Sequence, residues 1–218
     1  MINNSTEILA NDYLGNLLKG NRSNCSTITK QYLESNPSII DLYENIFKVS
    51  LYEVGRLWEI NKIGVATEHL ATAITEGILN ELFEQVIPKI RCDKKVVVAC
   101  VENEQHQVGI KMVADVFEMN GWESFFLGSG IPNTEFVRYI HEIKPDLIAI
   151  SLSVYFNFNN LMKMLEILNG EFPDLPILVG GQAFKNVLVA IHDRLGGAIF
   201  VPDLYALKFF IESLNSKF

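Results

Sequence analysis

The chain has 218 residues, of which 49% are hydrophobic, and its 18 basic and 26 acidic side chains give a formal net charge of -8. This length and composition suffice for one large domain or two modest ones. The negative charge, with no cluster of Lys and Arg, argues against a nucleic-acid-binding surface. No apolar run approaches the ~20 residues that cross a bilayer, and no signal peptide is visible, so we expect a soluble, cytoplasmic protein without membrane contact.

The first 88 residues show apolar positions at helical spacing, and the breaks in this pattern predict four helices. The expected helices cover about 5–19, 25–35, 38–61 and 66–87. In the third, four apolar residues spaced by four, three and four positions share one face: Phe47, Leu51, Val54 and Trp58. A helix with such a face needs partners, so the sequence predicts an all-α, four-helix bundle as an N-terminal domain over residues 1–90.

After a charged hinge at residues 91–95, short β-branched runs alternate with helical stretches. The expected strands are 95–101, 124–127, 147–152, 177–179 and 198–201. The expected helices are 106–120, 133–144, 158–170 and 183–194. This alternation predicts an α/β domain over residues 94–218 with a doubly wound parallel sheet of the Rossmann or flavodoxin-like type. Ligands of such sheets bind at the carboxyl ends of the strands.

The loop after the first expected strand carries Glu104, His106 and Gly109 in a Glu-x-His-x-x-Gly arrangement. It lacks the glycine-rich turn that the pyrophosphate of a dinucleotide requires, so a nicotinamide or flavin dinucleotide site is not expected. Taken alone, a histidine in this position is more often a surface or helix-capping residue than a metal ligand. Two further short motifs follow later strands: Ser151-Leu152-Ser153 and Gly180-Gly181.

In this order the three motifs resemble those of the cobalamin-binding domain family, except that Ser153 stands where leucine is usual. The resemblance implies that His106 is the lower axial ligand of cobalt and that the nucleotide tail of cobalamin inserts beside the sheet. Glu104 is the expected partner of the second ring nitrogen, because metal-ligating histidines commonly donate to a carboxylate. A slot for the tail needs small residues, and those expected to form it are Gly109, Ser151, Ser153, Gly180 and Gly181.

The bundle contains a second group, Trp58 followed after nine residues by Glu68-His69. This spacing resembles that of adenosylcobalamin-dependent photoreceptors, in which the bundle covers the upper face of the corrin. The resemblance implies that Trp58 packs on the upper ligand, that Glu68 accepts from ribose hydroxyls and that His69 supports this network. Without the resemblance, the sequence favours Trp58 as a core aromatic at the end of an amphipathic helix, and the Glu-His pair as polar residues of a first helical turn.

Two departures limit this resemblance. Glu59 follows Trp58 where those photoreceptors often have a histidine, which excludes capture of cobalt by a second histidine at that position. The chain also begins with the bundle, whereas regulators of that family begin with a DNA-binding helix-turn-helix domain, so we expect no direct contact with DNA.

The sequence leaves three functions open. The first is a stand-alone sensory module that binds adenosylcobalamin and signals light or cofactor level through a protein partner or self-association. The second is a corrinoid shuttle protein of a methyltransferase system, carrying methylcobalamin, and the third is a corrinoid store. No nucleophile–base pair suggests independent catalysis. Cys25, Cys92 and Cys100 show no disulfide or metal pattern, and His141 and His192 are expected to face solvent.

Overall fold

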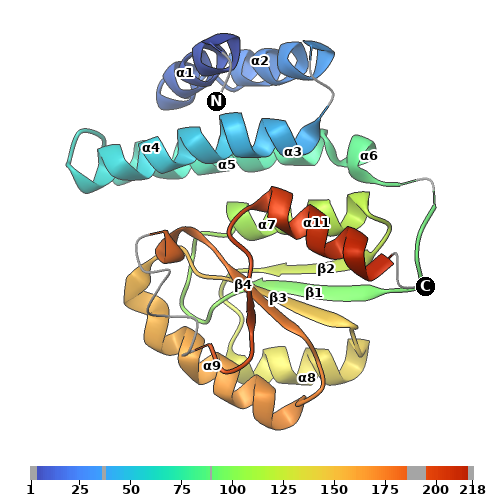
Figure 1. Cartoon of the computed structure of the whole chain (residues 1–218). Helices are drawn as coiled ribbons and strands as arrows, with labels where there is room; N and C mark the ends of the chain where they lie inside the picture. Colours follow the sequence, from blue (N-terminus) through green and yellow to red (C-terminus); the bar gives the residue numbers. More distant parts are fainter. Residues whose placement is uncertain (1–3, 36–37, 89, 186–194, 216–218) are drawn as a thin grey trace. The chain divides into compact units, whose positions relative to one another are not determined.

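The computed structural model describes residues 4–35, 38–88, 90–185 and 195–215, and the chain divides into two units, Met1–Glu84 and Gln85–Phe218 (Figure 1). The boundary lies a few residues before the position expected from the sequence. Each unit has its own buried side chains and is described separately below.

The first unit is entirely helical. Its helices are α1 (Asn4–Leu18), α2 (Arg22–Ser35), α3 (Ile39–Leu42), the π-helical turn η1 (Tyr43–Phe47), α4 (Lys48–Glu59), α5 (Val65–Glu81) and the start of α6 (Phe83–Val86). The single helix expected over 38–61 is thus one run of α3, η1 and α4, and it begins where the Ser38 hydroxyl accepts from the Asp41 N–H at 3.1 Å. The helix expected over 66–87 is interrupted at Leu82.

Three buried aromatic rings occupy the core of this unit. Tyr13 of α1 lies 5.2 Å from Phe47, whose ring is 5.8 Å from that of Tyr43, and the Tyr13 hydroxyl contacts the Thr75 hydroxyl of α5 at 3.3 Å. The apolar face expected on the third helix is buried at Phe47 and Val54 but not at its end, because Trp58 is 45% exposed. Trp58 is therefore not a core aromatic of this unit, which corrects that interpretation of the sequence.

The second unit is a five-stranded parallel sheet with strand order β2-β1-β3-β4-β5. Its strands are β1 (Lys95–Cys100), β2 (Glu123–Gly128), β3 (Leu147–Ser151), β4 (Ile177–Gly180) and β5 (Ile199–Phe200). Its helices are α7 (Val108–Met119), α8 (Asn133–Ile143), α9 (Phe158–Glu171) and α11 (Leu204–Asn215), with short 3-10 turns η2 (Tyr155–Asn157) and η3 (Gln182–Phe184). Figure 1 shows α7 and α11 on one face of the sheet and α8 and α9 on the other. The predicted doubly wound α/β fold is confirmed, and its strand order is the flavodoxin-like one.

Two parts of this unit differ from the sequence-based expectation. Helix α11 was not expected, although its buried Leu204, Leu207 and Ile211 recur at helical spacing, and the Asp203 side chain caps it by accepting from the Ala206 N–H at 2.8 Å. The helix expected over 183–194 is described only at its start, as η3. Residues 186–194, with His192, lie outside the described residues. None of the described helices is both long and apolar enough to cross a membrane.

Candidate functional site

The site lies where the chain leaves the two central strands. β1 pairs with β2 on one side and with β3 on the other, so the loops after β1 and β3 leave the sheet next to each other. This is the point at which the strand order reverses, and it is where open α/β sheets bind their ligands. The loop after β1 carries Glu104 and His106, and the loop after β3 carries residues 152–157.

Glu104 is the centre of this site, although its side chain is 1% exposed. Its Oε1 atom accepts from the N–H groups of Gln105 and His106, at 3.0 and 3.2 Å, and makes a close hydrogen bond to Nδ1 of the His106 ring. These contacts hold His106 in the loop, which is why α7 begins at Val108 and not at the expected residue 106.

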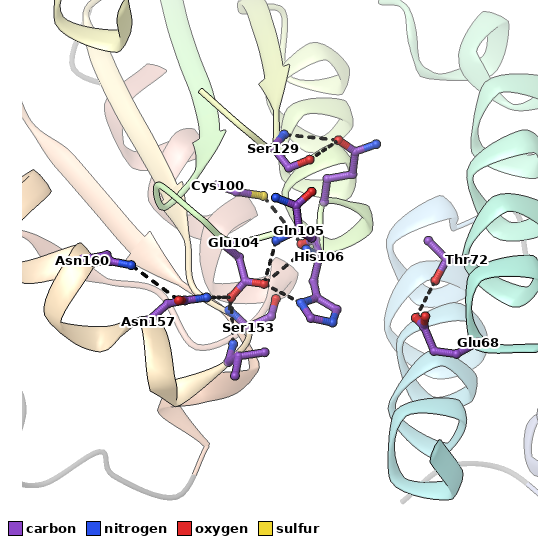
Figure 2. A network of polar contacts seen from close by, with 12 residues as sticks. Glu68, Thr72, Cys100, Glu104, Gln105, His106, Ser129, Ser153, Asn157 and Asn160 are labelled. Carbon is purple, nitrogen blue, oxygen red and sulfur yellow. Dashed lines mark hydrogen bonds and ion pairs between the residues drawn. The ribbon is translucent and has the colours of Figure 1, made fainter. Parts of the chain in front are cut away.

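The second carboxylate oxygen of Glu104 is bound by the loop after β3. Oε2 accepts from the N–H groups of Ser153 and Val154, at 3.2 and 2.9 Å, and from the side-chain amide of Asn157 at 3.3 Å. Figure 2 shows Glu104 between His106 on one side and Ser153 and Asn157 on the other. One buried carboxylate therefore joins the two loops.

These hydrogen bonds decide the charge of Glu104. Burial alone would raise the pKa of its carboxyl group, but the hydrogen bonds from His106 and from the Val154 N–H outweigh burial and lower the pKa to about 2. Glu104 is thus ionised at neutral pH and can only accept, so the proton shared with His106 resides on Nδ1. In this tautomer Nε2 is the ring nitrogen with a lone pair, as a metal-binding imidazole requires, and the ring is half-exposed.

Neighbouring side chains fix the backbone around His106. The Cys100 thiol donates to the His106 carbonyl at 3.6 Å, and burial together with the Glu104 charge raises the pKa of Cys100 to about 12, so the thiol stays protonated. On the other side, Gln107 Oε1 accepts from the backbone N–H and the hydroxyl of Ser129, both at 3.2 Å. Cys100 is therefore a supporting donor and not a metal-binding thiolate.

Asn157 and Asn160 belong to this network and were not identified from the sequence. The Asn160 side chain donates to the Glu102 carbonyl at 3.3 Å and contacts Asn157 Oδ1 at 3.5 Å. The only sequence signal was a group of asparagines at the start of the helix expected after β3. Nothing in the sequence linked that group to Glu104.

The small residues expected to form a slot play different parts. Gly181 has φ +121°, and a Cβ there would lie 2.2 Å from the Leu152 carbonyl oxygen, while a Cβ on Gly180 would lie 2.9 Å from that of Val201. This pair therefore allows close packing of backbone on backbone. Gly109 on α7, in contrast, has open space where a Cβ would point. Ser151 is buried at the end of β3.

The group predicted in the bundle lies within the first unit. Trp58 is in the last turn of α4, and Glu68 and His69 are in the first turns of α5, across the turn at residues 60–64. Glu68 Oε2 lies 2.5 Å from His69 Nδ1, and Oε1 accepts from the Thr72 hydroxyl at 3.1 Å. Besides Trp58, four large apolar side chains of this α4–α5 hairpin are exposed: Val49, Ile60, Val65 and Leu70.

Other candidate residues have ordinary surroundings. His141 is exposed, with its ring against Phe172, as expected for a solvent-facing histidine. The three cysteines are free thiols, buried at Cys25 and Cys100 and half-buried at Cys92.

The fold and the site define a class of protein. In the part of the chain that the structure describes, no three or more His, Cys, Asp or Glu side chains come together to hold a metal ion. His106 alone, oriented by a buried carboxylate at the switch point of a flavodoxin-like sheet, fits a metal whose other ligands come from a macrocycle, as in a corrinoid or a haem.

Comparison with known protein families identifies the macrocycle. Residues 94–199 match a family model described as a B12 binding domain, and residues 9–82 match a second family model with the same description. Both matched parts of the chain belong to B12-binding families, and the protein is a cobalamin-binding protein. The cofactor predicted from the sequence is thus confirmed.

Two relatives and one solved structure illustrate the range of these families. The transcriptional repressor CarH of Myxococcus xanthus is 25% identical over 159 residues, which are 72% of this chain and 52% of that protein. The chain thus spans about half the length of this repressor. Dimethylamine corrinoid protein 1 of Methanosarcina acetivorans is 24% identical over 184 residues, 82% of this chain and 83% of that protein. The Methanosarcina barkeri monomethylamine corrinoid protein shares the fold, with a TM-score of 0.77, 15% identity and coverage of 93% of this chain and 96% of that one.

Proposed function

We propose that the protein is a sensory module that binds adenosylcobalamin, with His106 as the lower ligand of cobalt and the α4–α5 hairpin covering the upper ligand. The observation that carries this proposal is the surface of the hairpin. Trp58 is 45% exposed among other exposed apolar side chains of the hairpin, and the Glu68 carboxylate lies in the same hairpin. An apolar surface with a carboxylate suits an adenosyl group, which offers a flat base and ribose hydroxyls.

The geometry of the second unit supports His106 as the lower ligand. Glu104 fixes the ring of His106 through Nδ1, so Nε2 would be the atom that binds cobalt. The residues proposed around the nucleotide tail remain Gly109, Ser151, Ser153, Gly180 and Gly181. Gly109 has the open space that this role needs, whereas the space beside Gly180 and Gly181 is filled by the Val201 and Leu152 carbonyls, so this pair would act by letting the backbones pack closely. His106→Ala is expected to abolish the absorption signature of histidine-ligated cobalamin in the holoprotein.

The upper ligand would supply the signal. When bound, adenosylcobalamin would supply a cobalt–carbon bond that light can break, and loss of the adenosyl group would remove the group that Trp58 and Glu68 are proposed to contact. A ligand shifts a conformational equilibrium only through its different affinity for the two states. The change in contacts at Trp58 provides such a difference, which a partner protein or a second copy would detect.

A corrinoid shuttle protein for methyl transfer is the second candidate. The share of each relative's length that aligns with this chain favours it. The chain aligns with 83% of a dimethylamine corrinoid protein but with only 52% of the CarH repressor. Under this function the upper ligand is a methyl group that a partner enzyme must reach. A pocket shaped for an adenosyl group is then not expected.

One experiment separates the two functions. The full chain and Trp58→Ala are titrated with adenosyl- and methylcobalamin in darkness, and spectra and molecular mass are recorded before and after green light. Tyr205→Ala, at an exposed aromatic residue of α11, is the control. For the sensor, Trp58→Ala weakens adenosylcobalamin about tenfold and leaves methylcobalamin unchanged, since only the large upper ligand contacts the indole. Equal affinities for Trp58→Ala and wild type, or tighter binding of methylcobalamin with no response to light, would reject the sensor.

A further inference from the structure

Three consecutive apolar residues after β3 are exposed to solvent: Val154, Tyr155 and Phe156. We name them the aromatic loop. Phe156 is 89% exposed and Tyr155 50%. Burial of a phenylalanine side chain removes apolar surface from water and stabilises the folded state, so an exposed ring forgoes that gain. Contiguous exposed apolar side chains of this kind usually mark a binding surface.

The aromatic loop is held in place by the site described above. The Val154 N–H donates to Glu104 Oε2 at 2.9 Å, and the Asn157 side chain donates to the same oxygen at 3.3 Å. The Asn157 N–H closes the turn on the Val154 carbonyl at 3.0 Å, and the ring of Tyr155 stacks on Phe158 at 5.4 Å. The carboxylate that orients His106 therefore also fixes the first and last residues of the turn that carries Tyr155 and Phe156.

We propose that the aromatic loop is a contact surface for the corrin macrocycle, and that Phe156 and Tyr155 touch the corrin ring when His106 binds the cobalt. This inference rests on His106 ligation in the proposed function, but not on a sensory role or an adenosyl group. The macrocycle extends well beyond its central cobalt, so it must cover residues next to the ligand. Because Val154 and His106 share one carboxylate, the aromatic loop begins within that area.

The chemistry of the loop favours a corrin over a protein partner. From Leu152 to Asn160 the chain has no charged side chain, only apolar, aromatic, serine and asparagine residues. A corrin ring presents methyl groups and uncharged amide side chains, so it matches such a surface without leaving a charge buried. Protein interfaces, by comparison, usually have a polar rim around an apolar centre.

The test measures binding of two ligands to the full chain. Aquocobalamin and aquocobinamide, which lacks the nucleotide tail, are titrated by absorption into wild-type apoprotein and into Phe156→Ala. We expect Phe156→Ala to weaken both ligands by the same factor of about ten, because the lost contact is with the ring and not with the tail. Phe156→Leu should recover part of the affinity, and thermal melts of the apoproteins check that each variant is folded.

Phe209→Ala is the matched control, since Phe209 is a phenylalanine of α11 that is 75% exposed. It should leave both affinities unchanged. The proposal is wrong if Phe156→Ala binds both ligands as wild type does, or if it changes the oligomeric state of the apoprotein without changing affinity, since a second copy then covers the loop. His106→Ala, titrated in parallel, reports on cobalt ligation itself. The experiment therefore distinguishes an error in assigning His106 as the cobalt ligand from an error in assigning the aromatic loop as the corrin contact surface.

Discussion

Asn157 supplies the only side-chain donor to Glu104 Oε2 among the described residues, and this makes it a positioning residue for His106. In Asn157→Ala the Glu104 carboxylate keeps its backbone donors, but Oε2 loses its side-chain donor, so the carboxylate and the imidazole bound to it are held less firmly. We expect cobalamin affinity to fall about tenfold, as is common when a group behind a metal ligand is removed. The measurements are titration with aquocobalamin and the nitrogen splitting in the electron paramagnetic resonance spectrum of the Co(II) form.

Asn169→Ala is the control for this prediction. Asn169 lies on α9, the helix that begins directly after Asn157, and its side chain donates to the Gly196 carbonyl at 2.9 Å, away from the Glu104 network. If Asn157→Ala and Asn169→Ala have the same affinity and the same Co(II) spectrum as wild type, Asn157 has no part in orienting His106.

The charge of Glu104 makes the stability of the apoprotein depend on pH. Its pKa in the folded protein is about 2, below the ordinary value of 4.5. The stabilisation is therefore complete above about pH 5 and is lost as the pH falls toward 2. Such a shift corresponds to about 3 kcal/mol. We expect the stability difference between wild type and Glu104→Gln, measured by urea unfolding, to shrink by about three quarters of this amount from pH 6 to pH 2.5, because the folded carboxylate is only partly protonated at pH 2.5. A difference that stays constant with pH would contradict this origin.

The site could be predicted from the sequence where its contacts are local. Glu104 and His106 are two residues apart, so a short motif was enough to pair them. Asn157 is 53 positions from Glu104, and only the pairing of β1 with β3 brings the two together. Ser153 was expected at the site because its side chain is small, yet it contacts Glu104 through its backbone N–H. Every residue except proline has such a group, so the residue type could not predict this contact.

Helix α7 begins at Val108, directly after the loop that carries His106. Gly109 lies in its first turn, with open space where the methyl group of an alanine would point, so Gly109→Ala should leave the apoprotein unchanged or stabilise it by up to about 1 kcal/mol. If the nucleotide tail occupies that space, the same change should weaken aquocobalamin and spare aquocobinamide. Thermal melts and the two titrations decide this. Equal effects on both ligands would place the tail elsewhere.

Gly181→Ala is expected to behave in the opposite way. Its φ of +121° and the 2.2 Å approach to the Leu152 carbonyl leave no room for a side chain, so the apoprotein itself should lose several kcal/mol of stability. A stable Gly181→Ala apoprotein would show that the loop after β4 can move away from Leu152.

Strands and helices were predictable where one physical signal dominated. β1 and β3 are continuous apolar runs buried on both faces of the sheet, and they were placed to within a residue. α11 was missed because its spacing, LYALKFFIESLN, also leaves Tyr205 and Phe209 exposed, which blurs the apolar face. The π-helical turn at Tyr43–Phe47 carries no distinguishing sequence signal that we identified.

The sequence predicted the alternation of strands and helices in the second unit but not the strand order. That order decides which loops are neighbours. With β1 between β2 and β3, the loops after β1 and β3 share the carboxylate of Glu104, and the loop after β2 reaches Gln107 through Ser129. Motifs that are distant in the chain thus become one site.

The residues expected below and above the corrin belong to different units of the chain. Every hydrogen bond to Glu104, and the aromatic loop, lies within residues 85–218, whereas Trp58, Glu68 and His69 lie within residues 1–84. Residues 91 and 92 are attached to the second unit, because the Arg91 guanidinium pairs with Glu118 at 2.7 Å and the Cys92 N–H donates to the Gly121 carbonyl at 2.8 Å.

We therefore expect a fragment of residues 85–218 to fold and to bind aquocobalamin within about threefold of the full chain, or ~0.7 kcal/mol. This binding should still depend on His106, as His106→Ala in the same fragment would show. The fragment should, however, bind adenosyl- and methylcobalamin equally, because the side chains proposed to contact the upper ligand are absent. The measurements are titrations of the three cobalamins and a thermal melt. A folded fragment that still prefers adenosylcobalamin would locate the selectivity in the α/β unit, and the role proposed for Trp58 would then be wrong.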